Sequence, residues 1–321
     1  MRDSTGVAPV SLPGSRRQDR RADPTGPSIG PSVYVEAVGP SGELERHPWN
    51  TSFTWRSPVP PYRALREHHA ESFDRDGFVV LDHVLSPAEV RDAPDEIDGY
   101  EARTDAWLRT QRDDRMMIAE AGAITFTTHL VARSEGLRAL TTHPTLLAVC
   151  ADLVGPDVNL YWDQAVYKKP EKPRRFPWHQ DNGYTYVEPQ QYLTCWIALT
   201  DATEVNGCPF VAPGVHRMGT LRHRYVEPLG WECFEQPPGR LGVAAPVRAG
   251  GVVVFSSLTP HLTGPNTTEL VRKAYIVQYA PAGAETLGGD PRSGPPTSRQ
   301  PCDASDRQFA VLRGGEPIRC P

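Results

Sequence analysis

The triplet His179-Gln180-Asp181 has the residue types and the spacing of a metal-binding pair. On a β-strand, side chains two positions apart leave the same face, so an imidazole nitrogen of His179 and a carboxylate oxygen of Asp181 can converge on one ion. The same triplet also occurs often as a surface pair or a hydrogen-bonded pair. A metal site therefore needs a further ligand from elsewhere in the chain.

His261 is the best candidate for that ligand among the ten histidines. It follows the apolar run 251–255 and a turn that ends at Pro260, which places it at the end of a predicted strand. Two histidines and one carboxylate on one face of an iron ion leave three positions open for other molecules. Five other histidines are interpreted as surface or hydrogen-bonding residues: His68, His69, His129, His143 and His216.

Arg272 opens another predicted strand shortly after His261. An iron site of this kind must hold a co-substrate that chelates the metal and carries a second, distal carboxylate. A guanidinium group matches a carboxylate with two parallel hydrogen bonds, which lysine cannot do. We therefore expect Arg272 to bind this distal carboxylate.

The elements that must position these residues change in type along the chain. Apolar spacing predicts helices over 62–74 and 144–153, and the capping box at residues 86–89 predicts a helix to about residue 110. Short β runs separated by turn residues predict strands over 77–81, 123–128, 158–167, 192–199, 209–212, 251–255 and 274–279. Helices followed by many strands predict an α+β, predominantly β domain, in which N-terminal helices back a β-sandwich or barrel.

The two ends of the chain differ in composition from its middle, because many of the 33 prolines and 27 glycines lie there. We expect residues 1–60 to be a tail that is partly ordered at most, with its aromatic segment 48–55 packing on the domain. Residues 61–280 are expected to form one domain. Residues 281–321 form a second tail, in which 307–312 is expected to return as an edge strand.

Composition limits the choice of partner. The net charge of −5 gives no basic excess for nucleic acid or an anionic membrane, so a small-molecule substrate is favoured. No apolar run is long enough to span a membrane, and residues 1–27 lack the apolar stretch of a secretory signal, so we expect a cytoplasmic protein. The six cysteines form no C-x-x-C pair and are interpreted as inert core thiols.

Several of these motifs occur together in one known family. The chain resembles the phytanoyl-CoA dioxygenase family in the order and spacing of residues 74–81, 179–181, 192–199 and 204–217, followed by His261 and Arg272. The resemblance covers roughly residues 65–280. It implies a double-stranded β-helix, the jelly roll of cupin-like proteins, which binds Fe(II) and 2-oxoglutarate and uses O2.

The resemblance also implies roles for individual residues. His179, Asp181 and His261 would hold iron, and Arg272 would hold the distal carboxylate of 2-oxoglutarate. Thr263 matches a small hydroxyl position that assists this carboxylate, and Trp196 matches an aromatic residue of the same pocket. A further residue, Gln164, is expected to face the co-substrate or the substrate.

The implied activity is a 2-oxoglutarate-dependent oxygenase, in which an unactivated C–H bond is hydroxylated or otherwise oxidised and succinate and CO2 are released. The carboxylate of Asp181 argues against halogenation, since halogenating relatives have a small residue at this position. Two alternatives use the same pocket: a zinc-type hydrolase and a barrel that binds a ligand without catalysis. Arg272 disfavours the first, and the intact triad disfavours the second.

The substrate is less constrained by the sequence. The run 168–175 carries five cations and one acid beside the site, so we hypothesise that it attracts a carboxylate or phosphate. The aromatic residues Trp162, Trp178, Tyr184 and Tyr186 indicate a partly apolar substrate. A composition rich in arginine, proline and alanine is associated with bacterial secondary metabolism.

Overall fold

The computed structural model describes residues 44–234 and 242–318. Its four α-helices are α1 (Glu67–Asp76), α2 (Pro87–Leu108), α3 (Glu135–Leu140) and α4 (Pro144–Leu153). The predicted start of α2 is confirmed, because the Ser86 hydroxyl accepts from the Glu89 amide and the Glu89 carboxylate accepts from the Ser86 amide. α1 begins later than predicted, since the amides of residues 63–65 donate to the Asp152 carboxylate.

The principal sheet is antiparallel and carries most of the predicted strands. Its order is β1 (Phe78–Leu81), β12 (Val252–Ser256), β7 (Leu193–Ala198), β14 (Arg272–Pro281), β5 (Val158–Lys168), β4 (Ile124–Thr128), β3 (Ala119–Glu120) and β2 (Arg115–Met116). The predicted edge strand near the C-terminus is confirmed as β17 (Ala310–Arg313), which pairs with β5 and with β18 (Glu316–Pro317).

The remaining strands form smaller sheets. One consists of β11 (Val243–Ala244), β8 (Pro209–Val211) and β13 (His261–Thr263), a second of β16 (Ser298–Pro301), β15 (Glu285–Gly288) and β6 (Val187–Glu188), and a hairpin of β9 (Arg224–Val226) and β10 (Gly230–Glu232). The sequence did not predict β15 and β16, which lie in a stretch rich in glycine and proline.

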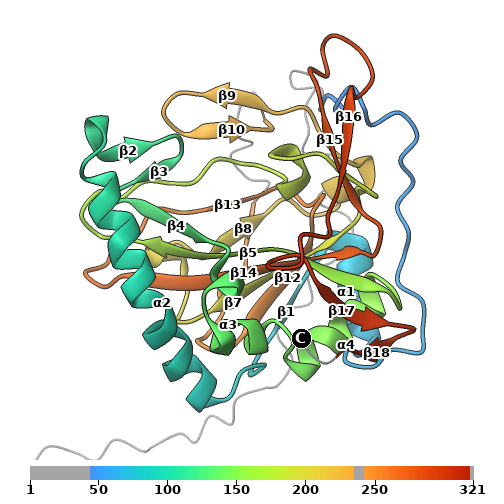
Figure 1. Cartoon of the computed structure of the whole chain (residues 1–321), viewed down its shortest axis with the longest axis horizontal. Helices are drawn as coiled ribbons and strands as arrows, with labels where there is room; N and C mark the ends of the chain where they lie inside the picture. Colours follow the sequence, from blue (N-terminus) through green and yellow to red (C-terminus); the bar gives the residue numbers. More distant parts are fainter. Residues whose placement is uncertain (1–43, 235–241, 319–321) are drawn as a thin grey trace, which may run out of the picture. The chain divides into compact units, whose positions relative to one another are not determined.

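The β8 and β13 sheet packs on the inner face of the principal sheet, and the jelly roll implied by the sequence is confirmed. Trp196 and Ile276 of the principal sheet share one buried cluster with Val211 of β8 and with Phe176. The outer face packs on the helices, where Tyr275 shares a second cluster with residues of α2, α3 and α4 (Figure 1). Because strand side chains alternate between faces, the even-numbered residues of β14 point into the barrel.

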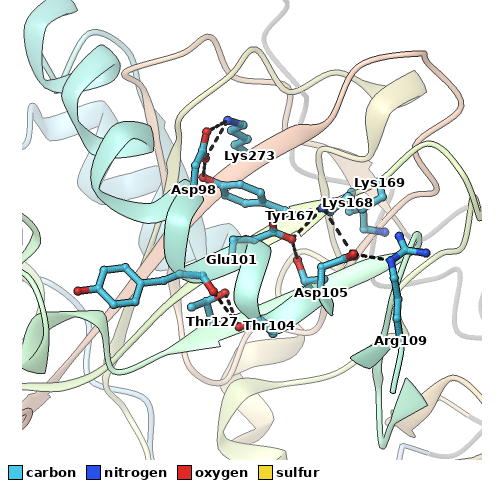
Figure 2. A network of polar contacts seen from close by, with 12 residues as sticks. Asp98, Glu101, Thr104, Asp105, Arg109, Thr127, Tyr167, Lys168, Lys169 and Lys273 are labelled. Carbon is cyan, nitrogen blue, oxygen red and sulfur yellow. Dashed lines mark hydrogen bonds and ion pairs between the residues drawn. The ribbon is translucent and has the colours of Figure 1, made fainter. Parts of the chain in front are cut away.

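Charged groups join α2 to the outer face of the principal sheet, as Figure 2 shows. Asp98 accepts from the Tyr167 hydroxyl at 2.6 Å and pairs with Lys273 at 2.6 Å. Glu101, which is buried, pairs with Lys169 at 3.0 Å. The helix is thereby fixed to the end of β5 and the start of β14, the two strand ends that reach the candidate site.

The segment before α1 contacts the domain, as the sequence indicated for its aromatic part. The Trp55 indole donates to the Asp74 carboxylate, and the Asn50 amide donates to the carbonyls of Met218 and Thr220. Most of the predicted N-terminal tail, residues 1–43, lies outside the described residues. The five cysteines in the described part of the chain are buried and unpaired. In that part, no helix is both long and apolar enough to span a membrane.

The Glu101→Ala substitution tests the link between α2 and the sheet. It removes the closer of the two ion-pair partners of Lys169, leaving Asp105 at 3.7 Å, and also the acceptor of the buried Thr125 hydroxyl. We expect the free energy of unfolding, measured by urea titration, to fall by about 2–3 kcal/mol. Arg109→Ala breaks an i,i+4 pair with Asp105 in which the arginine side chain is 51% exposed, and should cost about 0.5 kcal/mol or less. Equal losses in the two variants would contradict this assignment.

Candidate metal and co-substrate site

The three predicted metal ligands converge on one point at the inner face of the β11–β8–β13 sheet. They are His179, Asp181 and His261. The Nε2 atoms of His179 and His261 lie 3.7 Å and 3.8 Å from Oδ1 of Asp181, and the three atoms lie within 4.8 Å of one another. His179 and His261 exchange two backbone hydrogen bonds of 2.9 and 2.8 Å, so their side chains project together. One nitrogen from each imidazole and one carboxylate oxygen can bind a single divalent ion.

The sequence predicted that His179 and Asp181 lie on one β-strand, but the structure places Asp181 just beyond the extended segment that carries His179. Asp181 is the first residue of the short 3-10 helix η3 (Asp181–Gly183), not a strand residue. The chain turns after Gln180 because that side chain is buried and bound on three sides. Its amide nitrogen donates to the carbonyls of Gly219 and Leu258, and its oxygen accepts from the Leu221 amide.

Hydrogen bonds orient both imidazoles. Nδ1 of His179 lies 2.9 Å from the Pro177 carbonyl, and Nδ1 of His261 lies 3.0 Å from the Thr259 carbonyl. Because a carbonyl only accepts, Nδ1 carries the proton in each ring, and the lone pair of Nε2 faces Asp181. Burial, together with the neighbouring His261, lowers the pKa of His179 well below its usual value, so this ring is neutral at neutral pH.

A third histidine nearby, His223, is already engaged. Its Nδ1 lies 3.0 Å from the Leu221 carbonyl, and its Nε2 accepts from the backbone N–H of Gln180 at 2.9 Å. Burial lowers the pKa of His223 to about 4. It therefore serves as a neutral anchor for the loop that carries Asp181, and both of its nitrogens are used.

The carboxylate of Asp181 is held by a hydroxyl that the sequence did not single out. The Thr194 hydroxyl donates to Oδ2 of Asp181 at 2.5 Å, and the Gln278 amide donates to the same hydroxyl at 3.3 Å. Thr194 and Gln278 lie opposite each other on β7 and β14. The contact occupies Oδ2 and leaves Oδ1 facing the two imidazoles.

Arg272 lies inside the barrel, where its side chain is fully buried. One terminal nitrogen donates to the Val166 carbonyl at 3.3 Å, and the group lies 4.9 Å from the centre of the Trp196 ring. Its Nε and Nη2 have no hydrogen-bond partner in the described residues. Burial lowers the pKa of Arg272 to about 9, so an anion that bound here would stabilise the charged form.

Lys168, the first residue of the run that the sequence predicted to attract an anionic substrate, adds a second buried basic side chain. It ends β5 and pairs directly with Arg272 across the two strands, so both side chains leave the same face. Its ammonium group donates to the carbonyls of Arg174, Thr263 and Gly264. Burial and the nearby Arg272 lower the pKa of Lys168 well below its usual value. No carboxylate of the described chain pairs with either cation.

The structure places the other predicted residues on the same interior surface. Trp196 lies opposite Ile276, which lies opposite Gln164, so the three form one row across β7, β14 and β5. Thr263 lies two residues after His261 on β13 and therefore projects from the same face of that strand.

The aromatic residues expected around the site divide into two groups. The Tyr184 ring lies 5.2 Å from that of His179 and stacks on Phe176. Trp178 instead packs in a separate cluster with Phe234, and Tyr186 contacts His47 and Trp49. Trp162, near the middle of β5, packs edge-on against His129.

The cations of the run 168–175 contact internal partners. Besides Lys168, each of them forms an ion pair, with the following distances: Lys169–Glu101 3.0 Å, Lys172–Asp114 3.1 Å, Arg174–Glu120 3.5 Å and Arg175–Glu232 2.9 Å. The loop is therefore built into the domain. The expectation of an anionic substrate, which rested on this loop, stays a prediction.

Comparison with known proteins identifies the family. The family model for phytanoyl-CoA dioxygenase (PhyH) matches residues 73–274, more than half of the chain. The chain belongs to the phytanoyl-CoA dioxygenase family. It is thus a non-haem iron, 2-oxoglutarate-dependent oxygenase that uses O2, and neither the zinc-hydrolase alternative nor the non-catalytic barrel is supported.

Individual relatives of this PhyH-family chain include methylphosphonate hydroxylase of Gimesia maris, 26% identical over 67% of this chain and 80% of the relative. Ectoine dioxygenase of Bordetella parapertussis is 27% identical over 67% of this chain and 75% of the relative. Among solved structures, the epimerase SnoN in complex with Fe3+, alpha ketoglutarate and nogalamycin RO is similar in fold. Its TM-score is 0.58 at 24% identity, over 76% of this chain and 97% of that one.

The hydrogen bond from Thr194 predicts an effect on metal binding. Thr194→Val keeps the shape of the side chain but frees the Asp181 carboxylate, so we expect affinity for Co(II) or Fe(II), measured by calorimetry, to fall about tenfold or more. Thr194→Ser retains the hydroxyl and should bind metal within about threefold of the wild type. The assignment fails if the serine variant loses as much affinity as the valine variant, or if neither loses any.

Proposed function

We propose that His179, Asp181 and His261 hold Fe(II) and that Arg272 binds the distal carboxylate of 2-oxoglutarate. The proposed reaction is hydroxylation of an unactivated C–H bond in a small molecule of bacterial secondary metabolism. One observation carries the proposal: a triad of two imidazoles and a carboxylate opens into a barrel whose interior holds a buried guanidinium with two unpartnered nitrogens.

The donor set suits Fe(II). Two neutral imidazole nitrogens and one carboxylate oxygen are the ligands of iron oxygenases, and binding on one face leaves positions for the co-substrate and O2. The interior also suits an anion, because Arg272 is a buried guanidinium that no carboxylate of the described residues pairs with. A carboxylate on Nε and Nη2 of Arg272 would satisfy both orphaned donors at once.

Each residue of the site then has a separate proposed role in the reaction. When bound, iron and 2-oxoglutarate supply the oxidising power, with release of succinate and CO2. Arg272 fixes the far end of the co-substrate, and Trp196 covers the guanidinium and keeps water from it. Thr263 is proposed to donate its hydroxyl to the same carboxylate, and Gln164, on the same interior surface, to face the co-substrate or the substrate.

Hydroxylation is favoured over halogenation because Asp181 fills the position that a halide would need. Thr194 holds this carboxylate toward the imidazoles, so it is a fixed part of the site. SnoN and the carbocyclase SnoK, which share the fold, come from nogalamycin biosynthesis. This supports a place in secondary metabolism, and Tyr184 and Phe176 beside the triad support a partly apolar substrate.

Turnover with candidate bacterial metabolites tests the proposal. The chain, loaded with Fe(II) and supplied with 2-oxoglutarate and O2, should release succinate in about a 1:1 ratio with a product heavier by one oxygen atom, detected by mass spectrometry. His261→Ala should release neither. Product formation that continues without O2 or without 2-oxoglutarate would contradict the proposal.

A further inference from the structure

Solvent reaches one face of the principal sheet over β4 and β5. Four residues there are half-buried: Phe126 and Thr128 of β4, and Trp162 and Gln164 of β5. Gln164 has a strand on each side, since it pairs with Thr128 of β4 and with Ile276 of β14. Its exposure therefore comes from a face of the sheet and not from an edge. We call the four half-buried residues the β4–β5 surface.

The β4–β5 surface points into the barrel. The odd-numbered residues of the two strands point outward to α2, where the Thr127 hydroxyl donates to the Thr104 hydroxyl at 3.4 Å and the Tyr167 hydroxyl donates to Asp98 (Figure 2). Because strand side chains alternate, the even-numbered residues lie on the opposite, inner face. The helix covers the outer face, so solvent reaches Gln164 from inside the barrel.

One end of the β4–β5 surface adjoins the carboxylate of the candidate triad. Trp162 lies opposite Gln278 on β14, and Gln278 lies opposite Thr194 on β7, so the three form one row on the inner face. The Thr194 hydroxyl at the end of this row donates to Asp181. The Trp162 ring also packs edge-on against His129, with 4.3 Å between ring centres, which limits its rotation.

The other end of the β4–β5 surface adjoins the imidazoles. The ring of Phe126 lies 5.6 Å from that of Phe176, and the Phe176 ring lies 4.7 Å from that of His179. Asp181 and Tyr184, which stacks on Phe176, are themselves half-buried. The β4–β5 surface therefore borders the triad at both ends.

Three neutral polar groups of the β4–β5 surface lack a hydrogen-bond partner in the described residues. They are the Thr128 hydroxyl, the Gln164 amide and the Trp162 indole N–H. Together they supply both donors and acceptors for a ligand. The rings of Phe126 and Trp162 add apolar contact beside them. Aromatic rings next to neutral hydrogen-bonding groups suit a ring with an apolar face and hydroxyl groups at its rim.

Charged groups near the β4–β5 surface are already engaged. Of the inward-facing residues of the two strands, only Lys168 is charged, and its fully buried ammonium group donates to three carbonyls. Arg133, at the end of β4, donates to the carbonyls of residues 128 and 129, and Arg307 forms an ion pair with its neighbour in sequence. Recognition at this surface therefore does not depend on charge.

We propose that the β4–β5 surface binds the substrate and that this substrate is an uncharged ring compound with hydroxyl groups. Thr128 and Trp162 hydrogen-bond to those hydroxyls, and Phe126 and the indole ring contact its apolar C–H groups. The inference rests on the proposed function, because it names the substrate class of the same site. It argues against an anionic substrate, since the buried Arg272 is assigned to the co-substrate.

Three para-nitrophenyl probes that differ in one property test the substrate class. The β-glucoside is neutral and hydroxylated, the β-glucuronide adds a carboxylate to the same ring, and the cyclohexyl ether lacks the hydroxyls. Each probe is titrated by calorimetry into the full chain, loaded anaerobically with Fe(II) and 2-oxoglutarate. The glucoside should bind about fivefold or more tightly than either of the other probes.

A matched pair of variants on β4 tests the surface itself. Thr128→Val removes the inward hydroxyl and should weaken glucoside binding about fivefold. Thr127→Val removes a hydroxyl from the outward face of the same strand and should leave the affinity within about twofold of the wild type. Trp162→Leu should weaken binding about tenfold or more, because the indole N–H and the ring contact are both lost.

Three results would overturn the inference. The first is a wild type that does not bind the glucoside, or that binds the glucuronide or the ether as tightly. The second is an equal loss of affinity in Thr127→Val and Thr128→Val. The third is a charge-transfer band of Fe(II) with 2-oxoglutarate that is lost in Trp162→Leu, because Trp162 would then support the co-substrate. This band, recorded in the wild type before any probe is added, reports separately on the proposed function.

Discussion

The site depends on one interaction, the mutual pair of backbone hydrogen bonds between His179 and His261. It joins two segments that are far apart in the sequence and points both imidazoles to the same side. The carbonyls of Pro177 and Thr259 then fix the tautomer of each ring. Asp181 supplies the third candidate metal ligand. The buried side chain of Gln180, the residue before it, holds the chain where it turns.

Charge is distributed unevenly along the interior of the barrel. Arg272 and Lys168 lie in the row where β14 begins and β5 ends. Several residues further along β14, Gln278 donates to the Thr194 hydroxyl opposite it on β7, and this hydroxyl donates to the Asp181 carboxylate. The outer face of these strand ends is fixed by the carboxylates of α2. Helix and sheet therefore fix the position of the buried Arg272 guanidinium, which pairs with no carboxylate among the described residues, so the interior is suited to an anionic co-substrate.

Much of this architecture could be predicted from local patterns. The capping box at Ser86 and the helix 144–153 follow from residue preferences, and the triad follows from residue types, strand ends and the resemblance to a family. Thr194 and Gln278 could not be found in this way, because their roles depend on which strands pair and in which register. Lys168 carried a usable signal, since it lies four residues after Gln164 on one strand and so shares its inward face. Its charged neighbours hid that signal.

The central claim, that one triad and Arg272 together bind Fe(II) and 2-oxoglutarate, is tested most directly by an anaerobic titration followed in visible absorption. A weak charge-transfer band should develop to one equivalent of each in the wild type. It should be absent in His179→Ala, and Arg272→Met should need at least tenfold more 2-oxoglutarate to reach it. No band in the wild type, or a full band in His179→Ala, would contradict the account.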